Sequence, residues 1–418
     1  MLTVTLETML GILPRLRAAG LALAHALALA ALTLLLAAPA QTAQSRGKKK
    51  LPDPRPFSEA GIVSQEVQAV GDPALRVFAE SFPGKEWLYL ETDHCRFASS
   101  LGELSLGKKD RKRLAPELDL LRLYFPKLPL LPKKLTAEQY LFLMGMRMEK
   151  LYRDVQKVLQ VSDADFPASR AAQRGEGAYM GDGPYLGERE KFDFILHREM
   201  RTHEEFALEQ RGVNVKDSAR WHNRAPSKMI LSMPCHDSDL SKDQWLWPHL
   251  AHNATHMMLD GYKFFAYDIP LWLTEGFALY FEKQIEPDSW TREGGEGVFF
   301  ERERSKDWAG DVRKLGQKQK HAKVTKLMHA KGPADLDRDA HLTIWSMTNF
   351  LIEKYPDQYA QLLGTLKAQL DEQGYPTGRG MLDLQRKQFK EIWDWTPMQL
   401  EEKWLLWVTG KDEEVVEK

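Results

Sequence analysis

The sequence predicts an α+β fold, in which a small mixed sheet packs on helices and a helical body follows. Two observations lead to this class. Short segments rich in strand-forming residues occur between residues 86 and 234, and helical periodicity alternates with them. From residue 300 onward, helical segments alternate only with charged loops. Strands early and helices late are typical of an α+β layout.

The N-terminus is predicted to be a signal peptide that is not part of the fold. Arg15 and Arg17 precede a long Ala/Leu run, which ends in the small residues of a cleavage site. We therefore expect a secreted, periplasmic or cell-envelope protein with no stable membrane span after cleavage. An uncleaved anchor is the alternative, because the apolar run approaches the ~20 residues that span a bilayer. Residues 1–43 are assigned to the signal, and the polar, proline-rich residues that follow begin a linker or N-terminal extension at 44–85.

The strands and helices of the folded part follow from composition, periodicity and end signals. Thr136 is a candidate N-cap for the first long helix, Gly212 ends the next one, and Pro248 is tolerated early in the helix after that. The predicted strands lie at 86–98, 191–197 and 227–234, and the predicted helices lie at 136–161, 199–212, 242–262, 268–287, 341–355, 358–374 and 386–408.

These elements are assigned to one domain. Its core is predicted at 86–300, its C-terminal helical part at 301–408, and a frayed tail at 409–418. Tryptophans recur near helical spacing in the last part and are expected in its core. The charged run "KKDRKR" at 108–113 is expected to be a solvated loop.

Composition and charge exclude some partners and leave one question open. The chain is 43% hydrophobic and 28% charged, which is typical of a globular protein. Its net charge of −1 gives no electrostatic reason to expect a nucleic acid partner.

Export permits a disulfide between Cys95 and Cys235, but sequence cannot show that the two thiols meet.

The pattern with the clearest chemistry is a histidine pair in "WPHLAHNATHMMLDGY", residues 247–262. His252 and His256 are four positions apart, so they project from one face of a helix and can chelate one ion. Imidazole nitrogens are good zinc ligands, and a third ligand must come from elsewhere in the chain. Glu275 is the candidate, because it follows nineteen positions after His256 on the next predicted helix.

This spacing resembles the ligand pattern of gluzincin metallopeptidases. The run from Trp272 to Ala278, "WLTEGFA", is similar to the Trp-x-x-Glu-Gly-x-Ala segment of that group, which includes peptidase MA-like domains. The resemblance implies a zincin-type fold that binds one zinc ion per chain through His252, His256 and Glu275. It also implies hydrolase chemistry, with a peptide or protein as substrate or ligand.

Asn253 departs from the gluzincin pattern. The resemblance places a glutamate there as the general base, and an amide cannot take up a proton, although it can hydrogen-bond a metal-bound water. Loss of a general base typically costs about 10²–10⁴-fold in rate. We therefore expect a weak or inactive peptidase that binds peptide or a partner in its cleft. The alternatives are an active zinc hydrolase with a substitute base, either His249 or an acidic residue from another segment, and a metal-free binding or scaffold protein.

Four further residues are candidates for the site. His249 shares a helix face with the pair and is an alternative ligand, or else a residue that caps the helix or lines the cleft. The resemblance suggests His341 as an oxyanion donor. Asp260 and Glu282 lie one and two helical turns beyond predicted ligands, so either could orient a ligand imidazole or be a solvated charge.

Overall fold

The structure is a computed structural model of the 418-residue chain. It describes residues 55–66, 73–82, 86–171, 178–224, 227–235, 238–294, 297–302 and 307–411. The chain divides into two units, Met1–Pro52 and Asp53–Lys418. The predicted signal peptide and most of the predicted tail lie outside the described residues. Among the helices that are described, none has both the length and the apolar character that crossing a membrane requires.

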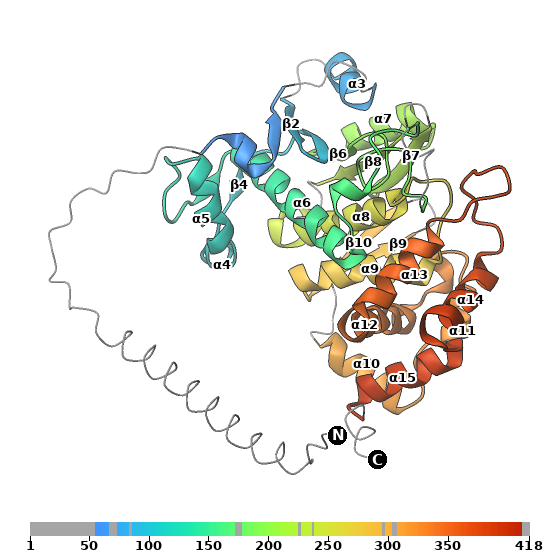
Figure 1. The fold of residues 1–418 in the computed structure, drawn as a ribbon. Coiled ribbons are helices and arrows are strands. Elements are labelled where there is room, and N and C mark those ends of the chain that lie inside the picture. Colours follow the sequence, from blue (N-terminus) through green and yellow to red (C-terminus); the bar gives the residue numbers. More distant parts are fainter. Residues whose placement is uncertain are drawn as a thin grey trace, which may run out of the picture. The chain divides into compact units, whose positions relative to one another are not determined.

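A six-stranded mixed sheet lies at the centre of the second unit (Figure 1). The strand order is β1-β2-β3-β6-β8-β7, in which β3, β6 and β8 run parallel and the other neighbours run antiparallel. The α+β class is therefore confirmed, with the mixed sheet early in the chain and helices after it. The strands are β1 (Ile62–Ser64), β2 (Leu88–Thr92), β3 (Cys95–Ser99), β6 (Phe192–His197), β7 (Ala219–Arg224) and β8 (Ser227–Pro234).

The strands β6 and β8 are buried at every position, as expected for parallel strands covered on both faces. Their apolar residues explain why sequence periodicity finds them. Even the charged Lys228 of β8 is buried, because its ammonium donates to Asp193 of β6 at 2.7 Å. Cys95 and Cys235 are both buried with free thiols, so no disulfide joins them.

The N-terminal side of the sheet differs from the prediction. The expected strand at 86–98 is a hairpin of β2 and β3, and β1 adds a further strand beside β2, so the sheet begins N-terminal of residue 86. The prediction of a loop at 108–113 is wrong, because Lys108–Arg113 form the short helix α4. Asp110 accepts a hydrogen bond from the backbone N–H of Gly107 at 2.9 Å and so caps this solvated helix.

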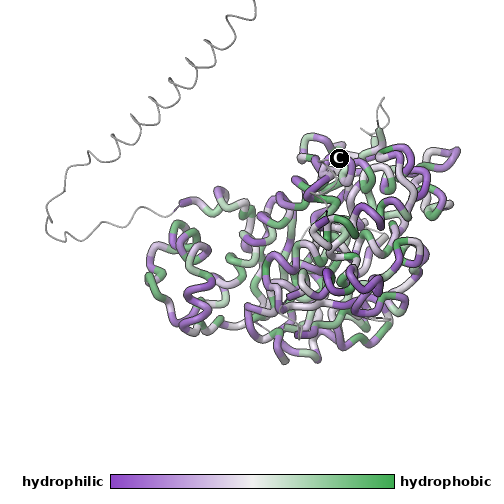
Figure 2. The backbone as a smooth tube through the Cα atoms, turned by 90° about the horizontal axis from the view of Figure 1, so that it is seen from below, coloured by the Kyte–Doolittle hydropathy of each residue, from purple (hydrophilic) through white to green (hydrophobic). Residues whose placement is uncertain are grey.

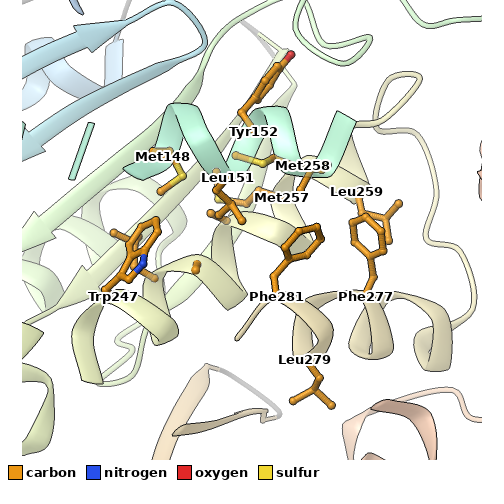
Figure 3. Packing of buried hydrophobic residues seen from close by; sticks show 14 of the residues in the cluster. Met148, Leu151, Tyr152, Trp247, Met257, Met258, Leu259, Phe277, Leu279 and Phe281 are labelled. Carbon is orange, nitrogen blue, oxygen red and sulfur yellow. The ribbon is translucent and has the colours of Figure 1, made fainter. Parts of the chain in front are cut away.

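The helix α6 (Ala137–Leu159) packs on the sheet and on α8 (Asp243–Gly261), which together with α9 (Leu271–Ile285) carries the predicted ligands. Thr136 caps α6 as predicted, since its side chain accepts from the backbone of Gln139. Figure 3 shows the packing between these helices, where Met148 of α6, Met257 of α8 and Phe281 of α9 belong to one buried apolar cluster. The ligand-bearing helices are thus fixed by a continuous core.

The C-terminal helices cover the far side of α9 (Figure 1). Gly276 allows α12 (Arg338–Lys354) to approach α9 closely, because a Cβ there would lie 2.1 Å from the hydroxyl oxygen of Thr348. The segment predicted as one element at 386–408 forms two helices. Asp394 ends the first with φ 59°, and Pro397 begins the second. The helices are α10 (Trp308–Gln317), α11 (Val324–Met328), α12 (Arg338–Lys354), α13 (Pro356–Leu366), α14 (Met381–Trp393) and α15 (Pro397–Thr409).

The remaining elements are short and lie mostly around this core. Figure 2 shows how hydrophilic and hydrophobic segments alternate along the backbone. The helices are α3 (Pro73–Ser81), α5 (Ala115–Tyr124) and α7 (Met200–Arg211), with single 3-10 turns at Phe57–Ala60, Asp163–Asp165, Ser238–Ser241 and Pro333–Asp335. The strands are β4 (Leu104–Ser105), β5 (Lys134–Leu135), β9 (Ser289–Glu293) and β10 (Val298–Arg302).

Candidate metal centre

Four side chains converge where α8, α9 and β9 meet. They are His252 and His256 from α8, Glu275 from α9 and Glu293 from the end of β9, and one ligand atom of each lies within 4.8 Å of all the others. The structure therefore brings together the three ligands predicted from the sequence. It adds a fourth, Glu293, which the sequence analysis did not single out.

The atoms that face one another in this cluster are buried without hydrogen-bond partners. Within the described part of the chain, this holds for Nε2 of His252, Nε2 of His256 and both carboxylate oxygens of Glu275. A buried polar atom left unsatisfied costs about 1–3 kcal/mol, so several at one point need a common explanation. Imidazole nitrogens and carboxylate oxygens are a donor set for a divalent cation such as zinc. The residues present thus fit a metal ion.

The spacing of the ligand atoms also fits a single ion. Nε2 of His256 lies 3.6 Å from Oε1 of Glu275 and 3.7 Å from Oε1 of Glu293. Zinc–ligand bonds of about 2.0–2.2 Å put tetrahedral neighbours roughly 3.3–3.6 Å apart. The other pairs of ligand atoms lie within 4.8 Å, so a contraction of about 1 Å at the widest pair would complete a tetrahedral site.

Glu282 contacts the ring of His252 and orients it, which is one of the two roles expected for Glu282 from the sequence. Its Oε2 lies 2.8 Å from Nδ1 of His252, so Nδ1–H donates and the lone pair of Nε2 faces the cluster. Its Oε1 accepts from the hydroxyl of Ser289 at 2.5 Å, and from the backbone and hydroxyl of Thr291 at 2.9 and 3.0 Å. Burial raises the pKa of Glu282, but these partners outweigh it and lower the pKa to about 2.

Burial also sets the protonation of two predicted ligands. It lowers the pKa of His256 well below its ordinary value, which keeps the imidazole neutral and able to bind a metal. It raises the pKa of Glu275 well above its ordinary value, and the nearby carboxylate of Glu293 adds to this shift. A cation between these carboxylates would reverse that shift, because it stabilises their ionised forms.

Asn253, at the position of the general base, is held at both ends of its amide. Its Oδ1 accepts from Nη1 of Arg220 at 2.8 Å, and its Nδ2 donates to the backbone carbonyl of His249 at 2.8 Å. Arg220 also forms an ion pair with Glu293. The arginine thus links the asparagine to the fourth residue of the cluster.

Arg220 and Glu293 come from strands that the sequence analysis missed, β7 and β9. Both strands carry charged residues, so neither produces an apolar run. A signal for β9 does exist, since Ser289, Thr291 and Glu293 alternate with a period of two. That period places all three on one face of a strand, and here the face lies toward α8 and α9.

His249 lies outside the cluster, and both of its ring nitrogens have partners. Nε2 is 2.8 Å from the hydroxyl of Ser218, and Nδ1 is 3.0 Å from the hydroxyl of Thr291. Burial lowers the pKa of His249 to about 3, so the ring is neutral. Metal ligation by His249 would require one of these hydrogen bonds to break, so the geometry favours its structural alternative.

His341 reaches the cluster from α12. Its Nε2 lies 3.8 Å from Oε2 of Glu275, and its Nδ1 lies 2.9 Å from the backbone carbonyl of Asp337. A carbonyl only accepts, so Nδ1 carries the proton, and Nε2 of the neutral ring presents a lone pair. The oxyanion-donor role considered for His341 would therefore require a protonated ring, whereas burial lowers the pKa of this histidine.

Asp260 lies at the end of α8 and lines a neighbouring cleft. Within the described residues, no hydrogen bond joins its carboxylate to His252 or His256, so it does not orient either ring directly. Its backbone carbonyl accepts from the ammonium of Lys367 at 2.5 Å. Burial raises the pKa of the Asp260 carboxyl to about 7.

The cleft has a volume of about 480 Å³, and His256, Arg220 and Glu293 form part of its wall. This volume lies in the range of roughly 300–1,000 Å³ that is usual for ligand-binding sites. Its other walls come from the start of α9, from the segment after α11 and from α14. Two residues of the cluster, His256 and Glu293, thus border a cleft whose lining is divided about equally between apolar and polar residues.

Comparisons with known proteins add no identity. No protein-family model matches the chain, and neither the curated proteins nor the solved structures include a similar one.

Proposed function

We propose that this is an exported, metallopeptidase-like protein that binds zinc through His252, His256 and Glu275, and that it is a weak or inactive peptidase. One observation carries the proposal, namely the convergence of buried nitrogen and carboxylate atoms that have no hydrogen-bond partner among the described residues. The residues are also those that the resemblance to gluzincins implies.

The donor set favours zinc over harder cations. Two of the ligands are imidazoles, whereas calcium and magnesium prefer oxygen ligands alone. Glu282 supports the choice, since a ligand histidine usually donates its other N–H to a carboxylate or carbonyl, as His252 does at 2.8 Å.

The residue at position 253 argues against efficient peptide hydrolysis. A bound zinc ion would supply Lewis-acid polarisation of a carbonyl or a water. Proton transfer, however, needs a group that titrates, and Asn253 has an amide that is already engaged by Arg220 and by the carbonyl of His249. We therefore assign the cleft a binding role, with a peptide segment as its ligand.

The lining of the cleft suits such a ligand. Apolar side chains, among them Ile269 and Leu271, line it together with a comparable number of polar and charged ones, such as Asp268 and Lys331. The apolar side chains can contact the side chains of a peptide, and the polar ones can bind its backbone amides.

The test is the zinc content of the mature protein, purified without chelator. We expect about one zinc per chain in the wild type and none in His256→Ala. His329→Ala is the matched control, because His329 is exposed on the cleft wall and its Nδ1 is 2.5 Å from the carbonyl of Thr325. That variant should keep its zinc. A wild-type protein that stays metal-free after zinc is added to the folded sample would refute the proposal and favour a metal-free binding protein.

Peptide cleavage tests the second half of the proposal. Zinc-loaded wild type and metal-free His256→Ala are compared on a mixed peptide library, and we expect little or no difference in the rate of cleavage. Cleavage by the wild type at rates far above those of the variant would instead identify an active hydrolase with a substitute base.

A further inference from the structure

We infer that Glu293 is a fourth protein ligand, which closes the metal site and gives the ion a structural role. This inference rests on the proposed zinc binding and extends it. Structural zinc sites have four protein ligands, whereas catalytic sites keep one position open for water or substrate. The number of protein ligands therefore decides which kind of site this is.

Glu293 approaches the cluster as closely as the predicted carboxylate ligand does. Its Oε1 lies 3.7 Å from Nε2 of His256, and Oε1 of Glu275 lies 3.6 Å from the same nitrogen. All four ligand atoms lie within 4.8 Å of one another. The two carboxylates thus lie at similar distances from the same ligand nitrogen, in one cluster.

The strand that carries Glu293 is tied to the other ligands. Ser289 and Thr291, on the same face of β9, donate to the carboxylate of Glu282, which in turn orients His252. Glu293 itself is the last residue of β9, and it pairs with Val298, the first residue of β10. The register of β9 therefore sets both the support of one ligand and the position of another.

Arg220 shares Glu293 with the cluster. Its guanidinium contacts Oε1 of Glu293, the same oxygen that faces His256, so Glu275 and Glu293 would balance the charge of the arginine and of a bound ion together. Arg220 contacts Glu293 from the side of β7 and also holds Asn253, so it acts as a positioning residue for the fourth ligand. A glutamate at position 253 would compete with Glu293 for this arginine.

The experiment measures whether the bound metal has an open coordination position. The mature full-length protein is loaded with Co²⁺ in place of zinc, and its visible absorption is recorded while azide is added. Azide binds cobalt only where a position is open or held by water. We expect a four-coordinate spectrum in the wild type that azide does not change.

The variants identify the residue that closes the site. Glu293→Ala should keep one Co²⁺ per chain, bind it roughly tenfold or more weakly and gain a spectral response to azide. Glu293→Gln keeps the size of the side chain, guards against a folding defect and should behave in the same direction. Glu301→Ala is the matched control, because it removes an exposed carboxylate from the same hairpin, and it should match the wild type.

Two contrary results distinguish a failure of the Glu293 inference from a failure of the proposed zinc binding. If the wild type binds one Co²⁺ and already responds to azide, and Glu293→Ala and Glu293→Gln are no different, the site is open and Glu293 is not a ligand. Zinc binding would then still stand. If the wild type binds neither Co²⁺ nor zinc, the proposed function fails together with the inference.

Discussion

Two clusters of buried histidines, one against the sheet and one on α8, differ in whether their ring nitrogens have partners. In the first, Nδ1 of His197 lies 3.1 Å from the hydroxyl of Thr202, and its Nε2 lies 2.9 Å from that of Ser232. His203 extends this series of hydrogen bonds. Its Nδ1 lies 2.8 Å from the hydroxyl of Ser232, and its Nε2 lies 2.8 Å from the backbone carbonyl of Asp217. Every ring nitrogen there is paired.

On α8 the rings of His252 and His256 are as deeply buried, but their Nε2 atoms have no hydrogen-bond partner among the described residues. Burial alone therefore does not identify a functional histidine. The useful sign is a buried lone pair that points at other lone pairs, because a bound cation can satisfy several of them at once.

Removal of metal should have the largest effect. Free zinc at 1,000 times its dissociation constant should add about 4 kcal/mol to the free energy of unfolding, since it binds only the folded chain. Urea unfolding with zinc and with a chelator measures this difference. His252→Ala should abolish the zinc dependence, whereas His203→Gln should retain it despite lower stability. Loss of the zinc dependence in His203→Gln would break the comparison between the two clusters.

A fall in pH should lower the stability of the fold through the cluster of His197 and His203, whose ring nitrogens are all paired. Burial lowers the pKa of His203 to about 4, below its ordinary value of 6.5. The unfolded chain therefore binds a proton between pH 6.5 and 4 that the folded chain does not, so stability falls as the pH falls through this window. The loss from this residue is of the order of 3 kcal/mol.

Unfolding in urea at pH 7 and pH 4, with chelator present in both, checks this loss. His203→Gln should show a shallower dependence of stability on pH than the wild type. Identical slopes in the two proteins would show that His203 does not carry the effect.

The next largest effect is on zinc affinity, and it comes from the carboxylate that orients the ring of His252. Glu282→Gln removes the charge that orients His252, so zinc affinity should fall about 10–100-fold while binding stays at one ion per chain. Competition with a chelating dye measures the affinity. Glu286→Gln, on the residue that follows α9 and contacts Gln244 instead, should leave the affinity unchanged. An equal fall in both variants would show a general effect of charge rather than of orientation.

The smallest effect concerns His249, the paired histidine of α8. Ser218→Ala removes the hydroxyl 2.8 Å from its Nε2 and should cost about 1 kcal/mol of stability. Zinc content should not change, as judged by metal analysis beside urea unfolding. If this variant lost its zinc, His249 would have to be counted among the residues that bind or position the metal.

The sequence alone could predict the elements that have strong apolar patterns. The strands β6 and β8 and the helices α8 and α9 were found in this way, and with them the three ligands of the resemblance. It did not identify Arg220 and Glu293, because β7 and β9 carry charged residues and lack an apolar run, and only the period-two spacing of polar residues in β9 indicated a strand.

The roles of His249 and His341 could also be assigned only from contacts in the three-dimensional structure. A helical wheel places His249 beside the ligand pair, but only the structure supplies the hydroxyls of Ser218 and Thr291 that occupy its ring. For His341, the sequence cannot say which nitrogen carries the proton, and here a backbone carbonyl four residues earlier decides it.

The β9 strand has a consequence for kinetics. If Glu293 ligates the metal as we propose, one strand holds both a ligand and, through Ser289 and Thr291, the support of another. A local opening of β9 away from α8 and α9 would then detach one ligand and remove the support of another in a single step. Substitutions that weaken the pairing of β9 should therefore speed the release of the metal.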